Sequence, residues 1–229
     1  MKTVNKKKIY IILVNYNGWQ DTIECLESLL KIDYPHYQLV LVDNNSPNGS
    51  IKYITAWAEG SLNIQEQEST IFKSFVMPYS KKPIPYVLYN REEAEKGGNK
   101  ATESRFKNPL IIIQSGYNGG FSFGNNVGIQ YVLARNDADY VLLLNNDTIV
   151  QSDFLTKLLK GATSSNNIGI TGAKIYYYDE PNMLWFNGGT FNEWFGRTTH
   201  IKKETTKDTS TCSFITGCCM LIKKDVFKK

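Results

Sequence analysis

Cysteine and histidine are scarce in this chain of 229 residues, and their spacing is uninformative. Four cysteines form no Cys-x-x-Cys pair, and the two histidines, His36 and His200, lie far apart. This spacing excludes a zinc site of the usual pattern and a disulfide framework. We therefore expect reduced thiols, as in a cytoplasmic protein. The cysteines are Cys25, Cys212, Cys218 and Cys219.

Long apolar runs and strong charge are also missing. No segment approaches the roughly 20 apolar residues of a membrane-spanning helix. The lysine-rich start imitates a secretory signal, but its apolar run lasts only from Ile9 to Val14 and no cleavage-type sequence follows. A net charge of +4 is too small for a nucleic-acid-binding surface. We expect a cytoplasmic protein, and peripheral contact with an acidic surface at the inner face of the membrane stays open.

Hydrophobic residues make up 41% of the chain, enough for one sizeable α/β domain or two small ones. Continuous apolar segments alternate with amphipathic ones along the sequence. This alternation predicts a mainly parallel sheet covered by helices on both faces. The predicted strands are 9–14, 37–43, 109–115 and 139–145, and the predicted helices are 19–30, 50–60, 122–135 and 152–161.

Two segments depart from this alternation. Residues 61–108 are rich in charged and polar residues but keep scattered aromatics, so we expect an insertion with a hairpin or two at the domain edge. From residue 168 onward the strands become short, which predicts a mixed or antiparallel extension of the sheet. The chain is thus predicted to be a single domain over 1–229 with an insertion at 61–108.

Polar clusters follow all four predicted core strands. In open parallel sheets, ligands bind beyond the carboxyl ends of the strands. Four polar clusters at one edge of one sheet therefore predict a binding site. The clusters are Asn15-Tyr16-Asn17, Asp43-Asn44-Asn45-Ser46, Asn118-Gly119-Gly120 and Asn145-Asn146-Asp147.

The cluster at Asp147 favours a metal. Mg²⁺ and Mn²⁺ prefer oxygen ligands, often one or two carboxylates together with substrate phosphates. Asn145 and Asn146 add amides that can bind hydroxyl groups of a sugar without adding charge. The alternative is a plain turn in which Asp147 caps the following helix, because Asn and Asp are common turn residues.

A glycine-rich run, "GYNGGFSFGNNVG" at 116–128, precedes the third long helix. Gly119 to Gly124 has the spacing of a P-loop, but Asn125 and Asn126 stand where a P-loop needs Lys and Ser or Thr. A phosphate can still bind at the start of this helix. The alternative is a tight turn with glycines for packing, which leaves the Asn125–Asn126 pair without a role. Asp43, Asn15 and Asn17 likewise suit either a base and ribose or strand termination.

The order of four motifs resembles glycosyltransferase family 2, most closely its bacterial rhamnosyltransferase-like branch that builds cell-surface polysaccharides. The motifs are "ILVNYNG", "LVLVDNNSPNGS", "GYNGGFSFGNNVGI" and "YVLLLNNDTIV", and the resemblance covers 9–59 and 109–229. It implies a GT-A fold, a nucleotide-diphosphate sugar donor such as a UDP- or dTDP-sugar, a divalent metal (Mn²⁺ or Mg²⁺) and inversion at the anomeric carbon. No nucleic-acid partner is implied.

The resemblance also assigns roles to residues of this chain. It places Asn15, Tyr16, Asn17, Asp43 and Asn44 along the nucleotide. It places Asn118, Gly119, Asn125 and Asn126 near the base or diphosphate, and Asn145-Asn146-Asp147 in place of the Asp-x-Asp motif. Asn145 in the first position removes one charge, so Asp147 alone is expected to hold the metal.

The catalytic base is expected beyond Lys229. The family's general base lies in an acidic segment that follows the last motif, whereas this sequence ends at Lys229. A base must lie within hydrogen-bond reach of the acceptor hydroxyl. Four acids are candidates without the matching context, and we expect them on the surface. They are Asp179, Glu193, Asp208 and Asp225.

The sequence therefore predicts an inverting, metal-dependent glycosyltransferase that transfers a sugar to a glycan or a lipid-linked glycan. Trp185 or Trp194 can stack on the acceptor sugar, or these aromatics pack a sheet edge. One alternative function is a nucleotide-sugar-binding module without turnover. A sugar nucleotidyltransferase is the other, but it needs a basic glycine-rich loop after the first strand, and "NYNGWQD" is not one.

Overall fold

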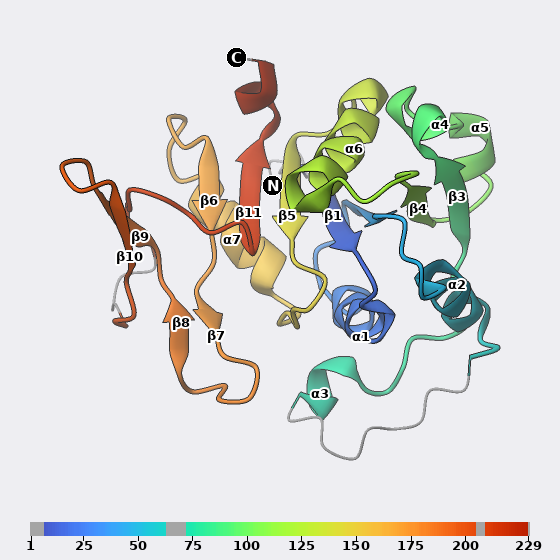
Figure 1. Cartoon of the computed structure of the whole chain (residues 1–229), viewed down its shortest axis with the longest axis horizontal. Helices are drawn as coiled ribbons and strands as arrows, with labels where there is room; N and C mark the ends of the chain where they lie inside the picture. The colour runs from blue at the N-terminus through green and yellow to red at the C-terminus, as the bar shows by residue number, and fades with distance from the viewer. Residues whose placement is uncertain (1–6, 63–71, 205–208, 229) are drawn as a thin grey trace, which may run out of the picture.

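A computed structural model describes residues 7–62, 72–204 and 209–228. A seven-stranded sheet forms its centre, in the order β3-β4-β2-β1-β5-β11-β6 (Figure 1). The strands β3, β4, β2, β1 and β5 run parallel, and β11 pairs antiparallel with β5 and β6. The strand bounds are β1 Ile9–Asn15, β2 Tyr37–Asp43, β3 Tyr86–Asn90, β4 Leu110–Gln114, β5 Tyr140–Leu144, β6 Ile170–Gly172 and β11 Cys219–Lys223.

Helices cover both faces of this sheet (Figure 1). On one face, the helices α1, α2 and α7 pack against Ile9, Ile11 and Leu13 of β1. On the other, α4 and α6 pack against Tyr10 and Ile12 of the same strand. Because successive side chains of a strand point to opposite faces, one apolar strand contributes to both cores. The helix bounds are α1 Trp19–Leu29, α2 Ser50–Glu59, α4 Arg91–Glu95, α6 Gly120–Arg135 and α7 Phe154–Ala162.

The four predicted strands and four predicted helices are thus confirmed, with shifts of one or two residues at their ends. No helix among the described residues is long and apolar enough to cross a membrane.

Segment 61–108 differs from the expected hairpins. Its described part adds one parallel edge strand, β3, which pairs with β4, and three short helices. The buried side chains of β3 are only Val87 and Tyr89, because Leu88 and Asn90 face solvent. This weak apolar signal explains why the sequence did not indicate a core strand here. The other short helices are α3 Lys73–Val76 and α5 Lys100–Glu103.

The C-terminal part forms the mixed extension that the short strands predicted. Besides the antiparallel β6 and β11, two small antiparallel pairs lie beside the main sheet. They consist of β7 Ile175–Tyr176 with β8 Leu184–Phe186, and β9 Gly189–Asn192 with β10 Arg197–His200; a 3-10 helix, η1, spans Lys224–Lys228. Of the candidate acids, Asp208 lies outside the described residues, as does Lys229.

Candidate functional site

The carboxyl ends of the central strands lie level with one another. Asn15 at the end of β1 is in register with Asp43 of β2, and Asp43 is in register with Gln114 of β4. Because parallel strands place these ends at one edge, the predicted polar clusters after β1, β2, β4 and β5 share that edge.

Asn15 is the centre of a hydrogen-bond network at this edge. Its side chain is fully buried, and its Nδ2 donates to Asp43 Oδ1 at 2.6 Å and to Ser46 Oγ at 3.1 Å. Its Oδ1 accepts from the backbone N of Gly18 and from Thr22 Oγ1, both at 3.1 Å. All hydrogen-bonding positions of this amide are therefore used within the protein, so Asn15 positions its neighbours.

Asp43 is buried too and is held mainly by Ser46. The Ser46 backbone N donates to Asp43 Oδ2 at 2.9 Å, and the Ser46 hydroxyl donates to Oδ1 at 2.6 Å. A carboxylate accepts about four hydrogen bonds, so capacity for one more remains. Tyr16 and Asn17 lie on the outside of this loop, with the Tyr16 side chain 48% exposed.

Asn44 connects the end of β2 to the loop before α6. Its Nδ2 donates to Asn118 Oδ1 at 3.2 Å and to the carbonyl of Gly120 at 2.9 Å. The Gly120 backbone N also donates to Asn118 Oδ1, at 3.0 Å. Asn44 Oδ1 is buried without a hydrogen-bond partner among the described residues. Such an unsatisfied acceptor is costly in a folded protein unless a ligand or water meets it.

The glycines of the run before and within α6 serve packing. A Cβ at Gly124 would lie 2.6 Å from Val14, and one at Gly128 would lie 2.7 Å from Ile12. These contacts bring α6 close against β1, so the packing role left open by the sequence applies to these two positions.

Asn125 and Asn126 point in different directions. Asn125 is buried, and its Nδ2 donates to the carbonyl of Phe121 one turn earlier, at 3.0 Å. Asn126 is exposed on the outer side of α6. Of the pair, only Asn125 therefore belongs to the buried polar layer of the edge.

The turn after β5 places one carboxylate in solvent. Asn145 donates its backbone N to the carbonyl of Cys218, at 2.9 Å, and Asn146 Nδ2 donates to Thr22 Oγ1, at 2.8 Å. Asp147 is exposed. Because α7 begins only at Phe154, Asp147 does not cap that helix, although the residues do form the turn that the sequence allowed.

A second carboxylate reaches the same turn from α1. The Cβ position of Gly18 lies 3.4 Å from Asn146 Nδ2 and 3.6 Å from Asp21 Oδ2, so both groups line one small space. Burial and the charge of Asp147 raise the pKa of Asp21. The charge of Asp147 also adds to the burial that raises the pKa of Cys218 to about 11. This edge is thus locally acidic, a condition that favours a cation.

The donor set fits a divalent metal that arrives with a phosphate ligand. Among the described residues, no group of three or more His, Cys, Asp or Glu side chains could hold a metal ion. Asp147 and the side-chain oxygens of Asn145 and Asn146 are hard oxygen donors, as Mg²⁺ and Mn²⁺ prefer. A metal here needs further oxygen ligands, which a diphosphate supplies.

Comparison with protein families identifies the chain. The sequence profile of glycosyl transferase family 2 matches residues 10–70 and 96–229, well over half of the chain. The chain belongs to glycosyltransferase family 2. The matched segments contain all twelve predicted site residues, while β3 and α4 lie between them.

Solved structures of glycosyltransferases resemble this family 2 chain in fold. A mannosyltransferase from Pyrobaculum calidifontis, solved with GDP-Man and Mn²⁺, is 12% identical with a TM-score of 0.55, and the match covers 98% of this chain and 47% of that one. Staphylococcus aureus TarS with UDP-GlcNAc is 16% identical (TM-score 0.38; 68% and 31% covered). Glucosyl-3-phosphoglycerate synthase from Mycobacterium tuberculosis with UDP is 15% identical (TM-score 0.38; 72% and 43% covered).

The family 2 chain therefore spans about half the length of the mannosyltransferase, and its sheet and helices are those of a GT-A fold. A search of curated proteins gave no match.

Some residues of this family 2 site were not indicated by the sequence. Thr22 and Asp21 hold or flank the predicted asparagines but lie in α1, where polar residues are ordinary. Only their position directly after the strand-end clusters could have pointed to them. The four cysteines are free thiols in the structure, as the sequence led us to expect. They are Cys25, Cys212, Cys218 and Cys219.

The candidate acids and tryptophans divide between surface and packing positions. Asp179, Glu193 and Asp225 are exposed, as expected of surface acids. Trp185 packs edge-on against His200, with ring centroids 5.3 Å apart, whereas Trp194 is 94% exposed in the turn between β9 and β10. Packing therefore explains Trp185, and Trp194 remains available to a partner.

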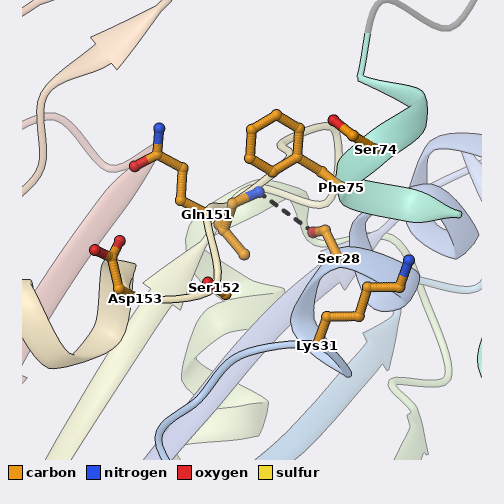
Figure 2. A pocket seen from close by; sticks show the side chains of 8 residues that line it. Ser28, Lys31, Ser74, Phe75, Gln151, Ser152 and Asp153 are labelled. Carbon is orange, nitrogen blue, oxygen red and sulfur yellow. Dashed lines mark hydrogen bonds between the residues drawn. The ribbon is translucent and has the colours of Figure 1, made fainter.

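A separate hollow of about 430 Å³ lies away from this edge (Figure 2). It is bounded by the second half of α1, by Phe75 of α3 and by the loop before α7. It includes none of the predicted site residues. Its lining residues are Ser28, Lys31, Ser74, Phe75, Val150, Gln151, Ser152 and Asp153.

Proposed function

We propose that the protein is an inverting, metal-dependent glycosyltransferase that takes a sugar from a nucleotide-diphosphate donor, with UDP- and dTDP-sugars as first candidates. One observation carries this proposal: the strand ends bring a buried amide network and the exposed carboxylate of Asp147 to one edge of the sheet. Neutral amides can bind hydroxyls and base edges, and one carboxylate can bind a metal–diphosphate without repelling it.

In this proposal Asp147 would hold Mn²⁺ or Mg²⁺ together with the donor diphosphate. Side-chain oxygens of Asn145 or Asn146 would be the other protein ligands of the metal. The bound metal supplies positive charge that stabilises the leaving diphosphate. The hydrogen bond from Asn146 Nδ2 to Thr22 fixes the orientation of that amide and leaves its Oδ1 for the ligand. The chain's own task is thus to hold the diphosphate and sugar in a fixed orientation.

In this proposal the remaining predicted residues lie along the bound nucleotide. Tyr16 and Asn17 are accessible from solvent, and Asn118 and Gly119 lie at the exposed start of α6. Asp43, Asn44 and Asn125 form the buried layer beneath them. We propose that the exposed residues contact the nucleotide and that the buried ones fix the backbone that contacts it.

The acceptor in this proposal is a glycan or a lipid-linked glycan. Inversion in one step needs a base within reach of the acceptor hydroxyl. Trp194, fully open to solvent at the tip of the β9–β10 pair, is the aromatic side chain that an acceptor sugar can reach.

The test is the melting temperature of the protein with UDP, dTDP or GDP, each with and without Mn²⁺. A ligand that binds the native state adds roughly 2.7 kcal/mol to the free energy of unfolding at a hundredfold excess over its Kd. We expect a shift for one nucleotide, larger with Mn²⁺, and loss of the Mn²⁺ contribution in Asp147→Asn. Glu193→Gln is the matched control, because Glu193 is an exposed acid on the β9–β10 turn. Equal Mn²⁺ dependence in Asp147→Asn and the unmodified protein would contradict the metal assignment.

A further inference from the structure

Tyr117 presents aromatic surface to solvent at the site edge. It lies three residues after β4, and its side chain is 53% exposed. Its backbone is nevertheless fixed: the Ser115 hydroxyl donates to the carbonyl of Tyr117 at 2.8 Å, and Gly116 between them has a φ of 86°, which favours glycine. The ring is therefore held at a defined place while much of it faces solvent.

Phe123 of α6 supports the Tyr117 ring from behind. The two ring centroids are 4.3 Å apart, with an angle of 34° between the planes. Gly119 makes this contact possible, because a Cβ at that position would lie only 2.4 Å from the Phe123 ring. The position predicted to approach the nucleotide thus has a second role, since its missing side chain leaves room for the support of Tyr117.

Arg91 adds a third layer. Its guanidinium lies over the Phe123 ring, 5.0 Å from the centroid. An ion pair with Glu95, at 2.6 Å, holds Arg91 in turn. Arg91 comes from the β3–α4 segment, between the two parts of the chain that match the family. This support is therefore a feature of this chain and does not follow from the family match.

Polar groups suited to a base edge lie next to this ring. Asn118 follows Tyr117 directly and is exposed, and its Oδ1 accepts from Asn44 and Gly120. Its Nδ2 carries hydrogens that can be donated outward. Asn44 Oδ1 is nearly fully buried beneath this loop, 3.3 Å from the Cβ position of Gly124 in α6, so Asn44 supports the loop from inside and Asn118 faces outward. A ring face beside amide donors and acceptors is how proteins recognise unpaired bases.

We propose that the base of the nucleoside diphosphate stacks on Tyr117, with Phe123 and Arg91 holding that ring in place. This proposal rests on the proposed function and fixes the direction of the donor across the site. From β4 to β5 the sheet makes three inter-strand steps, or about 14 Å. One elongated ligand can therefore place its base at Tyr117 and its diphosphate and sugar at Asp147.

The experiment measures the affinity of the nucleotide that shifts the melting temperature and, separately, of pyrophosphate, both with Mn²⁺. Base–aromatic stacking contributes about 1–3 kcal/mol, a factor of about 5 to 150 in affinity. We expect Tyr117→Ala to weaken nucleotide binding by about tenfold or more and to leave pyrophosphate binding unchanged. Tyr117→Phe keeps the ring and should bind the nucleotide like the unmodified protein. The matched control is Phe106→Ala, an equally accessible aromatic outside the site (44% exposed).

The outcomes separate the two proposals. Equal nucleotide affinity in Tyr117→Ala and the unmodified protein overturns the stacking role and leaves the proposed function intact. Parallel loss of nucleotide and pyrophosphate binding also overturns it, because the variant has then disturbed the whole edge. If Tyr117→Phe fails like Tyr117→Ala, the hydroxyl and not the ring is responsible, and stacking is wrong. Absence of any nucleotide binding in the unmodified protein overturns the proposed function itself.

Discussion

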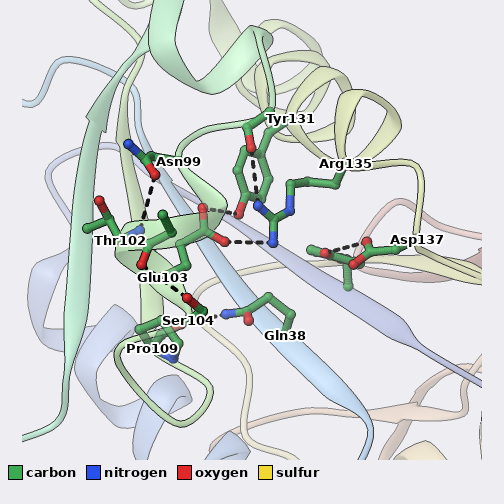
Figure 3. Close-up of polar contacts among 12 residues, drawn as sticks. Gln38, Asn99, Thr102, Glu103, Ser104, Pro109, Tyr131, Arg135 and Asp137 are labelled. Carbon is green, nitrogen blue, oxygen red and sulfur yellow. Dashed lines mark hydrogen bonds and ion pairs between the residues drawn. The ribbon is translucent and has the colours of Figure 1, made fainter.

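Two polar networks lie at opposite ends of helix α6, and they are built differently. At its start, the edge network (Asn15, Thr22, Asp43, Ser46 and Asn146) is made of amides, hydroxyls and one buried carboxylate. At its end, the Glu103 network (Tyr89, Glu103, Tyr131 and Arg135) contains a buried ion pair (Figure 3). The first adjoins exposed groups such as Asp147, whereas the second is enclosed by α5, α6 and β3.

The Glu103 network is directed inward. Glu103 Oε2 pairs with Arg135 at 2.9 Å, and Glu103 Oε1 accepts from the hydroxyls of Tyr89 at 2.9 Å and Tyr131 at 3.1 Å. Burial is the main reason that the pKa of Tyr89 rises to about 12. Arg135 Nε alone lacks a partner in this described network. Its groups bind one another, so it serves the fold.

The edge network differs from the Glu103 network because polar groups beside it are open to solvent. Its buried members also bind one another, but they have exposed polar groups beside them, namely Asp147 and Asn118. The difference teaches that buried polarity alone does not mark a site. A site is marked where a satisfied layer supports groups that are left open, and variants in the two networks should therefore have separable effects.

Replacing Glu103 with Ala should have the largest effect on stability. Removal of one partner leaves Arg135 as an uncompensated buried charge, with its side chain 10% exposed. Breaking a buried pair in this way costs about 3–5 kcal/mol. We expect a loss of that size in the free energy of unfolding from urea denaturation, while the Mn²⁺-dependent nucleotide shift of the folded fraction persists.

The control is the double variant Glu103→Leu with Arg135→Met, which removes both charges. Replacing a whole buried pair by apolar residues is often neutral or stabilising. Recovery of most of the lost stability would confirm that the unpaired charge is the cause. A Glu103→Ala protein as stable as the original would show that this network contributes little to the fold.

Thr22→Val should have an intermediate effect that appears in both stability and binding. The Thr22 hydroxyl donates its one proton between the carbonyl of Gly18 at 2.7 Å and Asn15 Oδ1 at 3.1 Å, and it accepts from Asn146 Nδ2 at 2.8 Å. Valine keeps the shape but leaves buried polar groups unpaired, which costs about 1–3 kcal/mol. We expect this loss in urea denaturation, together with weaker nucleotide binding because Asn146 is no longer oriented.

Thr156→Val on α7 is the matched control, because its hydroxyl bonds only to Asp33, at 3.3 Å, on the surface. It should leave both measurements near those of the unmodified protein. Nucleotide binding by Thr22→Val that equals the original would mean that the edge network supports the fold alone, and the contrast between the two networks would disappear.

The sequence predicted the sheet and the edge at which the polar clusters meet for a common reason. Short apolar runs such as Ile9–Val14 favour buried strands, and the polar clusters after parallel strands then meet at one edge. It could not distinguish Asn15, which is fully satisfied inside the protein, from Asn118, which is exposed, because residue type says nothing of partners.

Long-range pairing explains what the sequence did not show. Strand β3 carries two buried side chains, and its support comes from β4, about two dozen residues later. The Glu103 network and the Arg91–Phe123 contact join the same segment to α6. These contacts join residues far apart in the sequence and leave no periodic pattern in it. The weakly apolar segment 61–108 therefore did not indicate strand β3 or its contacts with α6.

Asp21→Asn should have the smallest effect, and it depends on pH. Burial, followed by the charge of Asp147, raises the pKa of Asp21 above its ordinary value of 3.8. A carboxyl group whose pKa is raised in the folded state favours folding while protonated and loses that contribution as the pH rises through the raised pKa. The unmodified protein should therefore lose stability relative to Asp21→Asn as the pH rises from about 4.

The measurement is the difference in melting temperature between Asp21→Asn and the unmodified protein across this pH range, without metal. Asp147→Asn tests the cause, because removing that charge should make the pH-dependent difference smaller. A Mn²⁺–nucleotide complex at Asp147 should do the same by supplying positive charge, whereas the Glu103 network, at the far end of α6, should not respond. A pH-independent difference would show that Asp21 and Asp147 do not share one electrostatic environment, and the local acidity that favours a cation at this edge would be lost as an argument.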